Sequence, residues 1–339
     1  MARKQQLINA QGQPSFGVFE DGIDDINYRD YDLRNAMDKR LGALAKRVKF
    51  NQFQFIGITS PSLLIGIAIV DLKLVSNAFV YCYDVVTNTF EEFSFLQPFA
   101  RGTHIDTQPN QGSASFRKGR QSVTIRATSR PGVRSVDVQL TSLQLSATID
   151  ESTSYQPLAI CTRAGYQGWV FTQKSNALVC NGQLHWQNRQ YDLHQLKALA
   201  SVDWTAGYMR RETFWNWGSL SCFLPDGRRL GFNLAAGVNE TGFSENALWL
   251  DGRLIKIDMV DFQFDRYQPK HAWAMTSNDG IIRLHFEPQG QRREKINGGV
   301  IASNFTQHFG RYYGEIHLPN EVIRLDGEWG FSEDHYAKW

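Results

Sequence analysis

The sequence is poor in the residue patterns that hold metals. Its four cysteines are far apart, and no Cys-x-x-Cys pair occurs among Cys82, Cys161, Cys180 and Cys222. Each lies in an apolar, strand-like segment, which favours buried free thiols over disulfides or zinc ligands. The eight histidines also lack a close pair with a third ligand nearby. We therefore expect no metal site, and free thiols that suit a reducing cytoplasm.

Loops that bind nucleotides and segments that cross membranes are also missing. Gly298-Gly299 has the pattern of a turn rather than of a phosphate-binding loop, and no Gly-x-Ser-x-Gly elbow occurs. The longest apolar run, residues 62–70, is too short to span a bilayer. The basic N-terminus has no apolar segment after it, unlike a secretory signal. These absences predict a cytoplasmic protein without a cofactor or a membrane span.

Neither sign of charge is in clear excess. The chain has 36 Lys and Arg against 34 Asp and Glu, a formal net charge of +2. No basic run interleaved with aromatics is present, so we expect no nucleic-acid partner. Hydrophobic residues make up 42% and charged residues 21%, which excludes general disorder. Aromatic residues reach 13%, which favours strands and aromatic-lined cavities over helix bundles.

From Phe50 onward the pattern is one of short strands separated by turns. Asn181-Gly182, Pro225-Asp-Gly227 and Asp251-Gly252 are typical turn sequences between such segments, one of which runs from Trp169 to Gln173. Before them, residues 35–47 form one amphipathic stretch, which predicts a short helix weakened by Gly42. Regular strands with few helices between them favour a mainly antiparallel all-β fold of closed barrels.

Two parts of the chain resemble each other. Phe53-x-Phe55 in the first half corresponds to Trp215-x-Trp217 in the second, and equal intervals separate Asn77 from Phe93 and Asn246 from Phe262. An ordered set of matches indicates duplication. We therefore predict an N-terminal extension over residues 1–48, a first barrel half over 49–155 and a second over 156–339.

A block of polar and aromatic motifs resembles a known family. The motifs are Asp203-x-x-x-Gly207, Arg210-Arg211-x-Thr213-x-Trp215-x-Trp217, Gly231-x-Asn233-Leu234, Glu245-Asn246-x-x-Trp249 and Gly327-Glu-Trp-x-x-x-Glu333-x-His335-x-x-x-Trp339. They resemble the bacterial domain-of-unknown-function family 2804 (DUF2804), and the resemblance runs from Phe16 to Trp339. That family has no established activity, so the resemblance implies a fold rather than a reaction.

The segment from Asp203 to Gly231 is more distantly similar to the carotenoid 1,2-hydratase and hydroxyneurosporene synthase group. This resemblance implies tandem lipocalin-like barrels, and some members of that group protonate an alkene and add water. That group usually carries a histidine-tryptophan element beside its aspartate. Here Asp203 is followed by Trp204 and Thr205, so no catalytic histidine is carried over.

Asp203 and Glu245 are the candidate acid/base residues. A carboxyl group inside an aromatic barrel is shifted toward its protonated form and can donate a proton at neutral pH. The alternative is a structural ion pair between Asp203 and Arg210 or Arg211. Strand alternation places Arg211 on one face with Trp215 and Trp217.

The candidate ligand-binding residues are Arg211, Trp215, Trp217, Asn233 and Asn246. At equivalent positions the first half has Phe53, Phe55, Ala68 and Ser76 in place of Trp215, Trp217, Asn233 and Glu245. The polar set is thus special to the second half.

Three functions fit these residues. The first is binding of a hydrophobic or amphipathic small molecule, such as a lipid or isoprenoid, in a barrel cavity. The second is a cofactor-free hydratase, isomerase or cyclase that uses Asp203 or Glu245 as its proton donor. The third is a structural or partner-binding protein whose polar cluster is an internal ion-pair network. The sequence leaves the oligomeric state open.

Overall fold

The computed structural model describes residues 5–128, 132–152, 156–238, 242–299 and 301–338. Within these ranges the helices are the short η1 (Tyr28–Asp30) and α1 (Ala43–Lys49), and strands make up most of the rest. None of the helices described is long and apolar enough to cross a membrane. The predicted all-β fold is confirmed: two curled antiparallel sheets form two lipocalin-like barrel halves.

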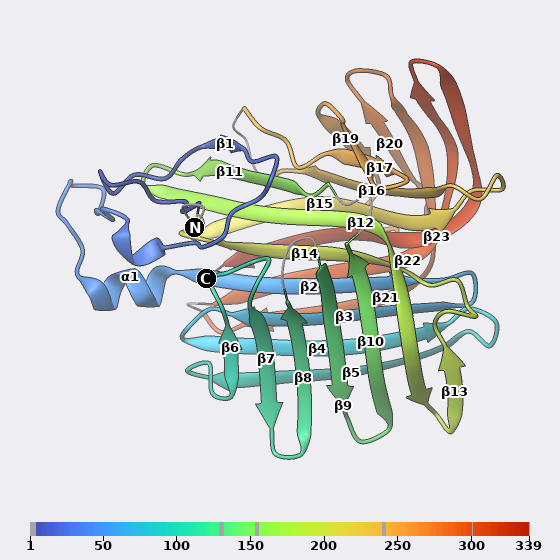
Figure 1. Cartoon of the computed structure of the whole chain (residues 1–339), viewed down its shortest axis with the longest axis horizontal. Helices are drawn as coiled ribbons and strands as arrows, with labels where there is room; N and C mark the ends of the chain where they lie inside the picture. Colours follow the sequence, from blue (N-terminus) through green and yellow to red (C-terminus); the bar gives the residue numbers. More distant parts are fainter. Residues whose placement is uncertain (1–4, 129–131, 153–155, 239–241, 300, 339) are drawn as a thin grey trace.

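The first sheet has 14 strands, and Figure 1 shows that it folds over so that β6–β10 cross β2–β5. Its order is β5 (Thr89–Pro98), β4 (Val75–Asp84), β3 (Leu63–Asp71), β2 (Asn51–Thr59), β14 (Leu199–Gly207), β12 (Gly168–Trp186), β10 (Leu143–Glu151), β9 (Gly132–Gln139), β8 (Gln121–Ala127), β7 (Ser113–Lys118) and β6 (Thr103–Ile105). Outside this path, β12 also pairs with β13 (Arg189–Asp192) and with β11 (Leu158–Ala164), which pairs with β1 (Gly17–Val18).

The second sheet has nine strands. Its order is β18 (Arg253–Lys256), β17 (Ala247–Leu250), β16 (Arg229–Ala236), β15 (Glu212–Phe223), β23 (Glu321–Lys338), β22 (Ala302–Leu318), β21 (Ile282–Asn297), β20 (Trp273–Ser277) and β19 (Val260–Gln263). Both sheets contain a meander of four consecutive strands, β2–β5 or β15–β18. In both, the first strand of the meander pairs with the last strand of the sheet, β14 or β23. The shared order agrees with the similarity between the two parts of the sequence.

The sheets divide between Gly207 and Glu212 rather than at the boundary expected between residues 155 and 156. Strands β11, β12 and β14 follow that expected boundary but belong to the first sheet, because β12 pairs with β10 and β14 pairs with β2. These pairings join segments far apart in sequence, so local turn signals do not reveal them. As a result, Asp203 lies on the first sheet and Glu245 directly before β17 of the second.

The helix expected over residues 35–47 is shorter and begins later, because α1 starts only at Ala43 after Gly42. The Asn35 side chain explains the difference, since its Oδ1 accepts hydrogen bonds from the backbone of Met37 (2.9 Å) and Lys39 (3.0 Å). These bonds stabilise a turn that competes with a helix. The local turn therefore replaces the first half of the expected helix.

The four cysteines are free, as expected. Cys82, Cys161 and Cys180 are buried, and Cys222 is partly buried. Burial raises the pKa of the Cys82 thiol well above its ordinary value. A thiol kept protonated by burial is a poor nucleophile, so these residues contribute to packing.

Apolar side chains gather in a core within each half and in a third cluster between the sheets. Ile56 and Trp204 lie in the core of the first half, and Phe232 lies in that of the second. The third, the inter-sheet cluster, consists of Phe55, Leu64, Ala68, Phe79, Tyr81, Tyr83, Trp217, Ala235, Phe309, Trp329 and Phe331. Side chains alternate along a strand, so Asp203 faces away from the core that contains Trp204 and toward the inter-sheet cluster.

Candidate functional site

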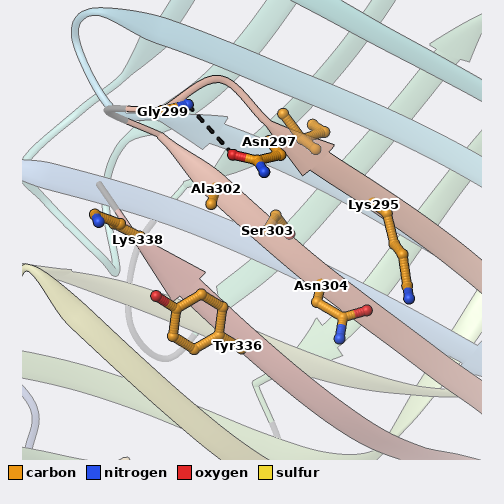
Figure 2. Close-up of a pocket in the computed structure, with 9 residues that line it drawn as sticks. Lys295, Asn297, Gly299, Ala302, Ser303, Asn304, Tyr336 and Lys338 are labelled. Carbon is orange, nitrogen blue, oxygen red and sulfur yellow. Dashed lines mark hydrogen bonds between the residues drawn. The ribbon is translucent and has the colours of Figure 1, made fainter.

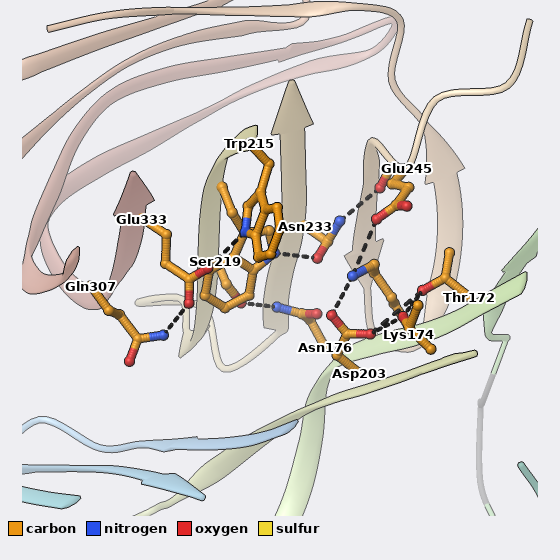
Figure 3. Close-up of polar contacts among 12 residues, drawn as sticks. Thr172, Lys174, Asn176, Asp203, Trp215, Ser219, Asn233, Glu245, Gln307 and Glu333 are labelled. Carbon is orange, nitrogen blue, oxygen red and sulfur yellow. Dashed lines mark hydrogen bonds and ion pairs between the residues drawn. The ribbon is translucent and has the colours of Figure 1, made fainter. Parts of the chain in front are cut away.

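Lys174, which the sequence analysis did not select, holds the two candidate carboxylates together. It lies on β12 directly opposite Asp203 of β14, and its Nζ forms an ion pair with Asp203 Oδ2. The same Nζ lies 3.2 Å from Glu245 Oε2 (Figure 3). The side chains of Lys174 and Glu245 are each 5% exposed, and that of Asp203 is 14% exposed. One buried cation therefore joins a carboxylate of the first sheet to one beside the second.

The two carboxyl groups beside Lys174 affect the pKa of its ammonium. Burial alone would lower the pKa of Lys174, but the charges of Asp203 and Glu245 together raise it above its ordinary value. Thr205 Oγ1 donates a hydrogen bond of 2.9 Å to Asp203 Oδ1, and Thr172 Oγ1 lies 2.7 Å from Thr205 Oγ1. The ammonium of Lys174 and the hydroxyl of Thr205 therefore both contact the Asp203 carboxyl group. This arrangement supports the ion-pair alternative for Asp203, with Lys174 rather than an arginine as the partner.

Asn233 and Asn246 use their amides to hold the backbone of the second sheet. Asn233 accepts a hydrogen bond of 2.7 Å from Trp217 Nε1 and donates one of 2.7 Å to the carbonyl of Glu245. Asn246 accepts one of 2.6 Å from the backbone of Ala235 and donates one of 2.9 Å to the carbonyl of Asp258. Both side chains are buried. These bonds give Asn233 and Asn246 a structural task, and their assignment to a ligand stays a prediction.

The two sheets meet closely beside Lys174. The Asn176 side chain of β12 reaches into the second sheet and donates to Ser219 Oγ (2.7 Å) and to the carbonyl of Phe232 (2.7 Å). Gly231 makes this approach possible, because a Cβ atom there would lie 2.6 Å from Asn176 Cβ. The motif that contains Gly231 thus serves sheet packing.

Glu333 of β23 is a third carboxyl group in this region (Figure 3). It shares a face of β23 with Trp329 and Phe331 of the inter-sheet cluster, and we call the surface formed by that cluster the inter-sheet face. It accepts hydrogen bonds from Trp215 Nε1 (3.1 Å) and Gln307 Nε2 (2.6 Å). Burial raises the pKa of Glu333 to about 7, although these two hydrogen bonds lower it. Asp203 raises the same pKa further and Lys174 lowers it. Glu333 is therefore a group that changes protonation near neutral pH.

His335 packs against the same tryptophan. Its ring lies 4.1 Å from that of Trp215 and 4.7 Å from that of Phe305, between ring centres. Its Nε2 is 3.1 Å from Ser303 Oγ, and burial lowers the pKa of His335 to about 3. A histidine that stays neutral at physiological pH supports Trp215 by packing rather than by charge.

Trp215 and Trp217 lie between the two sheets, whereas Arg211 lies at the surface. Trp217 is buried in the inter-sheet cluster and Trp215 is partly buried against it, so both lie between the halves rather than inside the second barrel. The core of the second half is filled from the opposite face of β15 by residues such as Leu220. Arg211 precedes the first residue of β15 and is exposed. Its role as a ligand contact stays a prediction.

Lys174, Glu333 and Gln307 were not identified from the sequence. Lys174 follows directly on the segment expected to be a strand over residues 169–173, and a lysine inside an apolar strand is itself a signal of a buried pair. Glu333 is part of the C-terminal motif, whose last residue, Trp339, lies outside the described residues. Among the residues described, no group of three His, Cys, Asp or Glu side chains could hold a metal ion.

Comparison with known proteins identifies the family. The model of the domain of unknown function DUF2804 matches residues 1–339, so the chain belongs to this family. No curated protein matches the chain.

Solved structures share its fold. A structure of CghA with Sch210972 has a TM-score of 0.59 at 9% identity, covering 98% of this chain and 97% of that chain. A structure described simply as CghA has a TM-score of 0.55 at 10% identity, covering 97% and 96%. Kievitone hydratase from Nectria haematococca has a TM-score of 0.50 at 8% identity, covering 85% and 88%. At these identities the likeness shows the fold alone.

Proposed function

We propose that the protein binds a hydrophobic or amphipathic small molecule between its two halves, against the inter-sheet face. The observation that carries this proposal is an aromatic wall with a few polar groups set into it. Phe55 meets Trp217 edge-on at 5.8 Å and Phe331 edge-on at 6.3 Å. Asp203 and Glu333 lie beside these rings and keep some exposure. Apolar walls with a few placed polar groups are typical of small-molecule sites.

Proteins of the same fold support this proposal by analogy. One is described with Sch210972, and another is described as a hydratase. Fold-level analogy does not transfer a ligand or a reaction. The free thiols suit a reducing compartment, so we include a cytoplasmic location in the proposal.

A second candidate function is cofactor-free acid/base catalysis at the same face. Glu333, whose pKa is raised to about 7, favours this function, because a general acid or base works best when its pKa is near the working pH. Trp215 and Gln307 fix the orientation of this carboxyl group. Asp203 and Glu245 fit the role of proton donor less well, because both form ion pairs with Lys174. In this function Glu333 donates or accepts the proton, and Asp203 and Glu245 contribute to the electrostatic environment of the bound molecule.

Native mass spectrometry of the protein purified from its own host tests ligand binding. We expect a retained apolar molecule in the wild type and its loss in Trp215→Ala, which removes a ring from the inter-sheet face. Phe214→Ala is the matched control, because Phe214 is the neighbouring aromatic residue on β15, points to the other face and is 54% exposed. A wild type without any retained molecule, or equal retention in Trp215→Ala, would argue against the proposal.

The same measurement separates a binder from an enzyme. If Glu333 transfers a proton to the bound molecule, Glu333→Gln should retain a different compound from the wild type, namely the unreacted substrate. For a hydratase the two compounds differ by one water, and for an isomerase they share a mass but differ in retention time. Identical compounds in both proteins favour binding without catalysis. The third alternative, a purely structural network, predicts that neither protein retains a molecule.

A further inference from the structure

A small cavity lies on the side of β22 that faces away from the first sheet. Phe305, Gln307 and Phe309 point toward the first sheet, so Thr306 and His308 point to the other side. The cavity has a volume of about 170 Å³. Its lining comes from β20, β21, β22, β23 and the segment that joins β19 to β20: Phe264, Asp265, Arg266, Tyr267, Pro269, Trp273, Gln291, Arg293, Asn304, Thr306, His308 and Asp334.

One wall of the cavity is flat and aromatic. The rings of Phe264 and Trp273 are stacked, with centres 3.9 Å apart and planes 9° apart. The ring of His308 meets that of Trp273 nearly edge-on at 5.5 Å. Trp273 is 2% exposed, so its position is set by the core of the second half. Such a rigid wall suits a planar apolar group.

His308 has no hydrogen-bond partner in the part of the chain that the structure describes, although it is only 3% exposed. Burial lowers the pKa of His308 to about 4; Asp334 raises it and Arg293 lowers it. The ring is thus neutral at physiological pH, with one N–H donor and one acceptor nitrogen. Buried polar groups are nearly always hydrogen-bonded. Because the His308 ring lines the cavity, its donor and its acceptor are available to a molecule that enters there.

The charges around the cavity leave one cation unmatched. Arg266 binds Asp334 through two hydrogen bonds of 2.5 and 2.8 Å, and Asp334 also accepts one of 3.2 Å from Asn216. Asp265 accepts a hydrogen bond of 2.8 Å from the backbone of Tyr267. By contrast, the side chain of Arg293 forms neither an ion pair nor a hydrogen bond with any described residue, and it is exposed. The carboxylates are therefore engaged, and the free group is a guanidinium.

We propose that this cavity binds a small carboxylate with a flat apolar body, at a site separate from the inter-sheet face. The apolar body lies against Phe264, the partly exposed ring that stacks on Trp273, and the carboxylate lies between His308 and Arg293. Guanidinium and carboxylate groups match in shape and form strong, charge-assisted hydrogen bonds. The volume of about 170 Å³ is below the roughly 300–1,000 Å³ of most ligand pockets, so the ligand is compact or only one end of it enters.

A hollow of about 460 Å³ adjoins this cavity, because Asn304 lines both (Figure 2). Lys295, Tyr336 and Lys338 also line it. Lys338 Nζ lies 3.3 Å from Glu212 Oε1, so this lysine already has an anionic partner. Lys295 lies two residues beyond Arg293 on β21 and is exposed. The adjoining hollow offers room and a second cation to the charged end of a longer ligand.

Binding of benzoate and of benzamide to the full chain, measured by calorimetry and ligand-observed NMR, tests this proposal. The two probes share a shape and differ in charge. We expect benzoate to bind the wild type and Arg293→Gln to weaken it about tenfold or more, as for a lost hydrogen bond between charged groups. Benzamide should bind more weakly than benzoate, and Arg293→Gln should leave it unchanged. Arg293 is exposed, so this variant should fold normally.

Two further variants separate this site from other effects. Arg324→Gln removes another exposed arginine of the second sheet, 81% exposed and far from the cavity lining, and should leave benzoate binding unchanged. Trp215→Ala should also leave it unchanged, since Trp215 belongs to the inter-sheet face. The proposal is overturned if benzoate does not bind, binds no better than benzamide, or binds Arg293→Gln as well as the wild type. Those results would leave the proposed function of the inter-sheet face intact.

Discussion

Two groups of carboxyl side chains face the space between the sheets, and they differ in the charge of their neighbours. Asp203 and Glu245 share the buried ammonium of Lys174. Among the described residues, the hydrogen-bond donors to Glu333 are the neutral side chains of Trp215 and Gln307, and the pKa of Glu333 is raised by burial to about 7. All three carboxyl groups are buried or partly buried, so they differ mainly in whether an ammonium or neutral donors contact them. A cation stabilises the charged carboxylate, whereas neutral donors do not fully offset the cost of burying it.

The largest expected effect comes from removing the cation. Lys174→Met removes the buried cation that contacts both Asp203 and Glu245, which should lower the free energy of unfolding by about 3–5 kcal/mol. Urea denaturation followed by tryptophan fluorescence measures this loss. Combining Lys174→Met with Asp203→Asn should recover part of it, because the variant then buries one negative charge fewer.

Lys118→Met is the matched control, because Lys118 is exposed on β7. Its effect should stay within about 0.5 kcal/mol, as for most surface substitutions. If Lys174→Met destabilises the protein no more than Lys118→Met, the cation does not distinguish the two carboxyl groups.

The next effect depends on pH and concerns Glu333. Its pKa is about 7 in the folded protein against an ordinary 4.5, so the folded state holds this proton more tightly. The stabilisation of the folded state by protonated Glu333 is complete below the pKa that Glu333 has in the unfolded chain, and it is lost as the pH rises through about 7. Glu333→Gln stays neutral, so its stability relative to the wild type should rise by about 2–3 kcal/mol between pH 4.5 and 8. Urea denaturation across this range measures the difference.

Glu287→Gln, at an exposed carboxyl on β21, is the control for this pH series. It should show no comparable change between pH 4.5 and 8. If Glu333→Gln and the wild type have parallel pH profiles, the pKa of Glu333 is not raised, and the argument for acid/base catalysis fails with it.

The smallest expected effect on stability is that of Arg211→Gln. Because Arg211 is exposed and precedes β15, the free energy of unfolding should change by less than about 0.5 kcal/mol. Retention of the small molecule, followed by native mass spectrometry, should fall below that of the wild type, because strand alternation predicts Arg211 on the same face as Trp215 and Trp217. Retention equal to that of the wild type would remove Arg211 from the predicted ligand contacts.

Several residues that the sequence singled out do lie close together between the two sheets. Asp203 and Glu245 were selected as polar residues among apolar strands, and both contact Lys174. Trp215 and Trp217 were predicted to share a face, and both lie at the inter-sheet cluster. What was not predicted is the partner: the ion pair with Lys174 depends on the register of β12 against β14. That register is set by contacts between strands rather than by the order of residues within one.

The sequence by itself determined the all-β class and the residues that share a face of a strand, because side chains alternate with a fixed period of two. Several residues of the family motifs, among them Trp217 and Gly231, lie where the two sheets meet, which the sequence did not reveal. Only the tertiary structure decided which face of β15 meets the other sheet and that β14 pairs with β2. Both depend on contacts between distant segments, and the burial that raises the pKa of Glu333 exists only after those contacts form.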